Sequence, residues 1–117
     1  IVLDHNGGPN HAGNFCGAPI MINTETTEVY YTPIYYVLAQ FSKTIRPGDK
    51  AVQTQKQLLD LDEDALHASA TINSEKLLSV QLLNTTKTPI TYQLQIGAQH
   101  ASITIAANAI QTVRVQL

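Results

Sequence analysis

The stretches TYQLQI (Thr91–Ile96) and TVRVQL (Thr112–Leu117) alternate polar and apolar residues. Successive side chains of a β-strand point to opposite faces, so this alternation places one face on a core and the other in water. The short β-prone runs of this half of the chain are Ala65–Ile72, Leu77–Leu83, Ile90–Ile96, Ser102–Ile105 and Ile110–Leu117. Five or six strands at this spacing predict an antiparallel β-sandwich.

The segments between these runs supply the turns, and one segment upstream is a weaker strand candidate. The turns are predicted at Asn73–Glu75, Asn84–Pro89 and Gly97–Ala101. Residues 52–57 are the weaker candidate because they contain Lys56 and three glutamines.

An acidic segment, LLDLDED (Leu58–Asp64), is predicted to be a solvated connection because it carries four carboxylates. Asp60, Asp62 and Asp64 alternate as in a calcium-binding loop, but the glycine that such a loop requires is absent. The four histidines lack the spacing of zinc ligands. We therefore expect neither a metal site nor a cofactor.

The first part of the chain differs in character. Ile1–Leu3 is interpreted as the end of a buried strand whose earlier part is missing. The following segment, Asp4–Pro19, holds four of the six glycines and two of the five prolines, which predicts irregular backbone. A loop of this length is typical of a functional segment, although a plain structural connection fits these residues equally well.

A hairpin and a helix are predicted next. Ile20–Asn23 and Glu28–Tyr31 flank a turn and form the hairpin. Thr32 is the predicted N-cap of the helix and Pro33 its first residue, which needs no N–H partner. An apolar stripe at helical spacing, predicted to pack in a core, consists of Ile34, Val37, Leu38, Phe41 and Ile45. The segment Arg46–Asp49 ends the helix.

The composition excludes several classes of partner. Hydrophobic residues make up 44% of the 117 residues and charged residues 14%, which favours a packed protein over a disordered one. The seven lysines and arginines are scattered and the net charge is −2, so nucleic acid is not an expected partner. No apolar run approaches the ~20 residues of a transmembrane helix, and no signal peptide is visible.

Motifs for the common hydrolytic mechanisms are absent. No GxSxG element is present, and none of the nine carboxylates lies in a motif that marks a catalytic pair. Cys16 together with His5 or His11 could imitate a Cys/His nucleophile pair. We interpret Cys16 instead as a small, buried, apolar thiol that has no disulfide partner.

The loop and helix together resemble a known family. GGPN (Gly7–Asn10), GNFC-AP (Gly13–Cys16 with Ala18-Pro19), Tyr-x-Pro (Tyr31, Pro33) and FSK-IRPG (Phe41–Lys43 with Ile45–Gly48) occur in this order over more than 40 residues. This segment resembles the last barrel segment of glycoside hydrolase family 30, which includes the glucosylceramidases. The rest of the chain is similar to the family more loosely, through Val80–Asn84 and Ile110–Thr112.

The resemblance implies a fold and a division into domains. The family pairs a (β/α)8 barrel with a side β-sandwich, and active sites of such barrels lie at the C-terminal ends of the strands. Residues 1–49 would form the end of the barrel, namely the end of strand eight, the active-face loop, the hairpin and the last helix. Residues 50–117 would form the side sandwich, incomplete because an early segment of the family contributes to it. The fold class is thus mainly β.

The resemblance also implies where the chemistry lies. The acid/base and nucleophile glutamates of the family lie upstream of Ile1, so no catalytic residue is expected in this chain. Asn14 matches a family residue that approaches the glycone pocket, and Phe15 matches a neighbour that supports it. His11 matches a loop position that is often aromatic in relatives, which implies a place at the rim of the substrate site.

Two functions follow as hypotheses. In the first, the chain is the C-terminal part of a retaining β-glycosidase that acts on a β-glucoside such as glucosylceramide or a β-glucan. The chain alone would be inactive, and its partner would be the remainder of the barrel, on the same or another chain. In the second, it is a stand-alone β-sandwich that binds sugar or protein. The family has secreted, lysosomal and bacterial members, so the resemblance leaves the compartment open.

Overall fold

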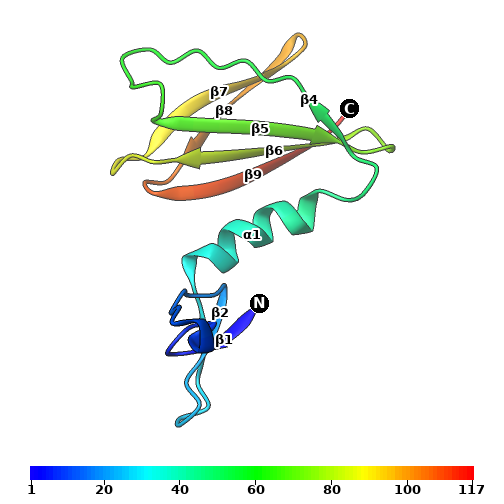
Figure 1. The fold of residues 1–117 in the computed structure, drawn as a ribbon. Helices are drawn as coiled ribbons and strands as arrows, with labels where there is room; N and C mark the ends of the chain where they lie inside the picture. Colours follow the sequence, from blue (N-terminus) through cyan, green and yellow to red (C-terminus); the bar gives the residue numbers. More distant parts are fainter. The chain divides into compact units, whose positions relative to one another are not determined.

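The computed structural model describes residues 1–117, which divide into two compact units, Ile1–Phe41 and Ser42–Leu117. The first unit contains a three-stranded sheet, a short 3-10 helix and most of the one α-helix (Figure 1). The second contains six strands in two sheets.

The sheet of the first unit has the order β1-β2-β3. Its strands are β1 (Val2–Asp4), β2 (Ile20–Ile22) and β3 (Val29–Tyr31). β1 pairs in parallel with β2, and β2 pairs antiparallel with β3, with Met21 opposite Tyr30. The predicted hairpin is therefore confirmed. The parallel pairing of β1 with β2 brings both ends of the intervening loop to the same sheet.

The helix α1 spans Pro33–Thr44, so both predicted helix ends are confirmed within one or two residues. Thr32 precedes Pro33 as predicted, but its hydroxyl donates to the carbonyl oxygens of Ala18 and Pro19 at 3.0 and 3.1 Å. The one hydrogen of this hydroxyl is shared between the two carbonyl oxygens, which lie at the end of the loop. With twelve residues, α1 is too short to cross a membrane, and the structure has no other α-helix.

The apolar stripe of α1 is exposed within this chain, contrary to the prediction that it packs in a core. No residue of the helix is buried, and Ile34 and Leu38 keep more than half of their surface exposed. The apolar periodicity identified the helix correctly. It does not show which other part of a protein the apolar stripe packs against.

The second unit is built from two antiparallel sheets (Figure 1). The larger sheet has the order β4-β5-β6-β9, and β7 pairs with β8 in a separate two-stranded sheet. The strand bounds are β4 (Lys50–Val52), β5 (Leu66–Ile72), β6 (Leu77–Asn84), β7 (Ile90–Ile96), β8 (Gln99–Ile105) and β9 (Ala109–Gln116). The predicted antiparallel sandwich is confirmed by this arrangement.

Two local predictions in this unit are wrong. Residues 53–57 are not a strand; the strand in this region is β4, which ends at Val52. The predicted turn Gly97–Ala101 is shorter, because β8 begins at Gln99 and pairs with Ile96. The left-handed conformation of Gly97, with φ at 59°, lets the chain reverse within two residues.

The core of the second unit lies between the two sheets. Ile105, which is 1% exposed, is the largest apolar side chain that is completely enclosed. The other buried apolar residues that cluster with it are Ala65, Leu66, Ala70, Leu78, Val80, Leu82 and Ile90. Leu78, Val80 and Leu82 occupy alternate positions of β6. The apolar positions of the two alternating stretches pack against this cluster, as predicted, namely Tyr92, Leu94 and Ile96 of β7 and Val113 and Val115 of β9.

Replacing Ile105 with alanine is expected to destabilise the second unit by about 3 kcal/mol, since it removes buried methylene groups and leaves a cavity. Urea unfolding of the chain measures this loss. Leu59→Ala is the control, because Leu59 is 76% exposed and should change the unfolding free energy by less than about 1 kcal/mol. Equal losses for the two variants would contradict this assignment of the core.

Candidate functional site

The loop between β1 and β2 is folded back on itself. The backbone N–H of Gly8 donates to the Cys16 carbonyl at 3.1 Å, and the N–H of Cys16 donates to the Gly8 carbonyl at 3.2 Å. Between these residues the 3-10 helix η1 (Asn10–Ala12) ends at Gly13, whose φ of 67° reverses the chain. The pair of hydrogen bonds therefore closes a nine-residue loop, Gly8–Cys16, that presents residues 10–15.

Gly7 makes the closure possible. A Cβ at this position would lie 2.5 Å from the Cys16 carbonyl oxygen and 2.8 Å from that of Phe15. These are backbone atoms of the opposite arm of the loop, and φ of Gly7 is 76°. Only glycine permits both this close approach and this conformation at low cost.

Asn14 lies next to the closed end of this loop and is exposed. Its backbone N–H donates to the Pro9 carbonyl at 3.2 Å. Its side-chain Oδ1 accepts a hydrogen bond from the Cys16 thiol, with Sγ and Oδ1 3.0 Å apart. No acceptor in the chain receives a hydrogen bond from Nδ2, so two amide hydrogens are available to a ligand.

Phe15 and His11 belong to the same loop. Phe15 is 69% exposed, and His11 lies exposed in η1. The structure thus brings all three predicted sugar-site residues onto one closed loop. Their role in binding stays a prediction.

The interpretation of Cys16 as a buried thiol is wrong, because this residue is exposed. Its hydrogen-bond partner is Asn14, and neither His5 nor His11 contacts it by a hydrogen bond. Sequence reasoning missed the Asn14–Cys16 contact. The signal was the i, i+2 spacing, which places two side chains on the same side of an extended segment.

The hairpin between β2 and β3 carries an acidic tip. The Tyr30 hydroxyl donates to Glu28 Oε2 at 2.5 Å, and this hydrogen bond raises the pKa of Tyr30. Thr26 Oγ1 lies 3.3 Å from the same carboxylate oxygen. The Glu28 carboxylate thus accepts hydrogen bonds from side chains of its own hairpin.

The structure contains no group of three or more His, Cys, Asp or Glu side chains that could hold a metal ion.

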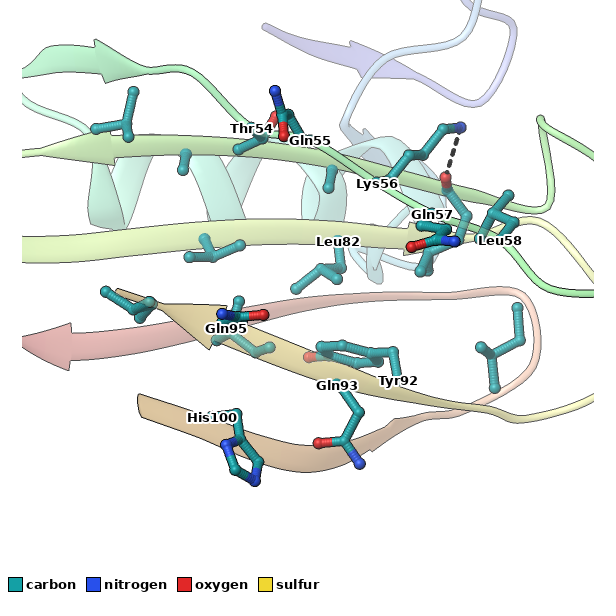
Figure 2. A pocket seen from close by; sticks show the side chains of 18 of the residues that line it. Thr54, Gln55, Lys56, Gln57, Leu58, Leu82, Tyr92, Gln93, Gln95 and His100 are labelled. Atoms are coloured by element: carbon teal, nitrogen blue, oxygen red, sulfur yellow. Dashed lines mark hydrogen bonds between the residues drawn. The ribbon is translucent and has the colours of Figure 1, made fainter. Parts of the chain in front are cut away.

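An open groove of about 1310 Å³ runs along the core face of the second unit (Figure 2). Its floor is apolar, formed by β5 and β6, with Leu82 of β6 and Tyr92 of β7 among the lining residues. The connection after β4 borders it, where the ammonium of Lys56 donates to the carbonyl oxygens of Glu63 and Leu66. Lys56 thereby joins the acidic segment to the first residue of β5.

Tyr92 is the only aromatic residue after Phe41. It is half-buried against the core, which raises the pKa of its hydroxyl, and this hydroxyl donates to Gln111 Oε1 at 2.9 Å. A sandwich that binds sugar through aromatic side chains would need such a ring on its outer surface. The ring of Tyr92 contributes to the core instead.

The folds of the two units and the loop between β1 and β2 agree with one family of proteins. The TIM-barrel domain of glycosyl hydrolase family 30 matches residues 1–45, and the β-sandwich domain of the same family matches residues 49–113. The chain belongs to glycosyl hydrolase family 30.

Individual relatives agree with this assignment. "Putative glucosylceramidase 4" of Caenorhabditis elegans is 36% identical over 83 residues, which cover 71% of this chain and 15% of the relative. The structure of SrfJ from Salmonella typhimurium matches with a TM-score of 0.84 at 21% identity, covering 99% of this chain and 25% of that one. The endo-β1,6-glucanase BT3312 matches with a TM-score of 0.80 at 20% identity, covering 98% and 25%.

These relatives differ from the chain in length. The chain spans 15% of the glucosylceramidase relative and 25% of each of the two solved structures. The two structural matches, below 25% identity, establish the fold.

Proposed function

We propose that this chain supplies the active-face loop and the side sandwich of a retaining β-glycosidase that acts on β-glucosides. The observation that carries the proposal is the order of the two family matches, barrel at residues 1–45 and sandwich at residues 49–113. Glucosylceramide is the first substrate candidate, because the C. elegans relative is named a glucosylceramidase. A β-glucan is the second, in view of the glucanase among the structural neighbours.

The two catalytic carboxylates belong, in this proposal, to barrel strands that precede Ile1 in the complete enzyme. A retaining glycosidase needs two carboxyl groups about 5 Å apart, one as acid/base and one as nucleophile. The Glu28 carboxylate is already bonded to Tyr30 and Thr26 at the hairpin tip. The acids of residues 58–64 lie in the connection that precedes β5. This chain therefore contributes substrate contacts.

The loop between β1 and β2 supplies these contacts. Asn14 donates from Nδ2 to a sugar hydroxyl, since both of its amide hydrogens are free while Oδ1 is engaged by Cys16. Phe15, 69% exposed, borders the pocket beside it, and His11 lies at the rim. A neutral amide suits this role because it makes directional hydrogen bonds at a smaller desolvation cost than a charged group.

The sandwich of residues 50–117 is incomplete in the same proposal. The groove of about 1310 Å³ is bordered by Leu59 and Leu61, which are 76% and 43% exposed, beside core residues that the two sheets already bury. A further segment of the complete enzyme lies in this groove and covers these two leucines. The exposed stripe of α1 is covered in the same way by the rest of the barrel.

The proposal is tested by measuring hydrolysis of an aryl β-glucoside by two proteins. One is the purified 117-residue chain, and the other is the polypeptide translated from the same gene together with its upstream coding sequence. We expect the longer protein to be active and the chain alone to be inactive, with circular dichroism showing that the chain is folded. Hydrolysis by the folded chain alone, or none by the longer protein, would refute the proposal.

Replacing Asn14 with alanine in the longer protein is expected to lower kcat/KM for the aryl glucoside about tenfold. This corresponds to the loss of one or two neutral hydrogen bonds to the sugar. Asn10→Ala is the matched control, because Asn10 is an exposed asparagine of the same loop whose side chain makes no hydrogen bond. An unchanged kcat/KM for Asn14→Ala would remove Asn14 from the substrate site.

A further inference from the structure

We propose that Cys16 is a positioning residue that sets the orientation of the Asn14 amide toward the substrate. This inference rests on the proposed function, because it concerns the same sugar-binding loop. The observation is the hydrogen bond from the Cys16 thiol to Asn14 Oδ1, with the two heavy atoms 3.0 Å apart. Both side chains are exposed on the loop that the Gly8–Cys16 backbone pair closes.

A primary amide has two ends of opposite hydrogen-bonding character. Oδ1 accepts and Nδ2 donates, and a half-turn about the last side-chain bond exchanges them. In the structure the thiol donates to Oδ1. Its sulfur is only a weak acceptor for an N–H group. The Cys16 thiol therefore favours the orientation in which Oδ1 faces sulfur and Nδ2 faces away from it. In that orientation the amide presents two donors to a sugar oxygen.

The backbone keeps the two side chains at this distance. Cys16 is fixed by its two hydrogen bonds to Gly8, and Asn14 is fixed by the bond from its N–H to the Pro9 carbonyl. A weak S–H donor is effective here because the backbones of Cys16 and Asn14 are already held in place. Forming the bond therefore costs no backbone entropy. Loss of the thiol should release the amide but leave the loop closed, since the closing bonds are made by backbone atoms.

The test compares Cys16→Ala with Cys16→Ser in the longer protein that hydrolyses the aryl glucoside. Alanine removes the donor, and we expect kcat/KM to fall about fivefold, as for one neutral hydrogen bond. Serine keeps an O–H donor at the same position, and we expect it to recover most of this loss. The melting temperature should be the same for both variants, because Cys16 is exposed.

A double-mutant cycle separates positioning from a direct contact. If Cys16 acts through Asn14, adding Cys16→Ala to Asn14→Ala should cause no further loss of kcat/KM. A full fivefold further loss, or no effect of Cys16→Ala in the protein that retains Asn14, would overturn the inference but leave the proposed function intact. No effect of Asn14→Ala itself would overturn the role of Asn14 in substrate binding, and with it this inference.

Discussion

Replacing Asn84 with aspartate is expected to lower the free energy of unfolding of the second unit by more than about 4 kcal/mol at neutral pH. Asn84 is 0% exposed. Its Nδ2 donates to the carbonyl oxygens of Thr88 and Ala106 at 2.8 and 2.9 Å, and its Oδ1 accepts from the Thr86 N–H at 2.8 Å. A carboxylate would lose both donations and face two carbonyl oxygens without water. Urea unfolding of the chain measures the change.

The control is the same substitution at Asn73, in the turn between β5 and β6. Only the oxygen of this amide is used, as Oδ1 accepts from the N–H groups of Glu75 and Leu77 at 2.9 and 2.8 Å. A carboxylate can accept both bonds, so Asn73→Asp should change the unfolding free energy by less than about 0.5 kcal/mol. Similar effects of the two substitutions would show that the donations of Asn84 do not hold the sandwich together.

Replacing Gly7 with alanine is expected to open the loop that carries Asn14. The new Cβ would lie 2.5 Å from the Cys16 carbonyl oxygen, and the left-handed backbone adds strain of about 1 kcal/mol or more. The backbone bonds between Gly8 and Cys16 must then lengthen or break. We expect kcat/KM of the complete glycosidase to fall at least about 100-fold, since misplacement of substrate contacts by about 1 Å has effects of this size.

Gly17→Ala is the matched control for this loop. A Cβ at Gly17 meets no atom within 4 Å, and its φ is not in the left-handed region. Chemical shifts of the Asn14, Phe15 and Cys16 amides report the loop without reference to activity, and they should move in Gly7→Ala but stay in place in Gly17→Ala. Unmoved shifts in Gly7→Ala would mean that the loop absorbs the Cβ without opening.

The pattern of short β-prone runs, two of which alternate polar and apolar residues, predicted five of the six strands of the sandwich. It fails at residues 53–57 because a strand needs a partner, and β5 pairs only with residues 50–52 on that side. The helix was predictable from Thr32, Pro33 and the apolar stripe. The site residues were found through the resemblance of the GGPN and GNFC motifs to a family, since a glycine-rich loop has no periodicity that would identify them.

The sequence by itself determined the order of the elements, the antiparallel sandwich and the membership of a glycosidase family. These properties depend on local periodicity and on motifs of consecutive residues. Both can be recognised from the order of the residues along the chain alone. The tertiary structure decided which of the polar residues cooperate. The contacts of Gly7 with Cys16 and of Asn84 with Ala106 join residues 9 and 22 positions apart. Such contacts form only where the backbone folds back and brings distant residues together, and no local sequence pattern specifies this folding back.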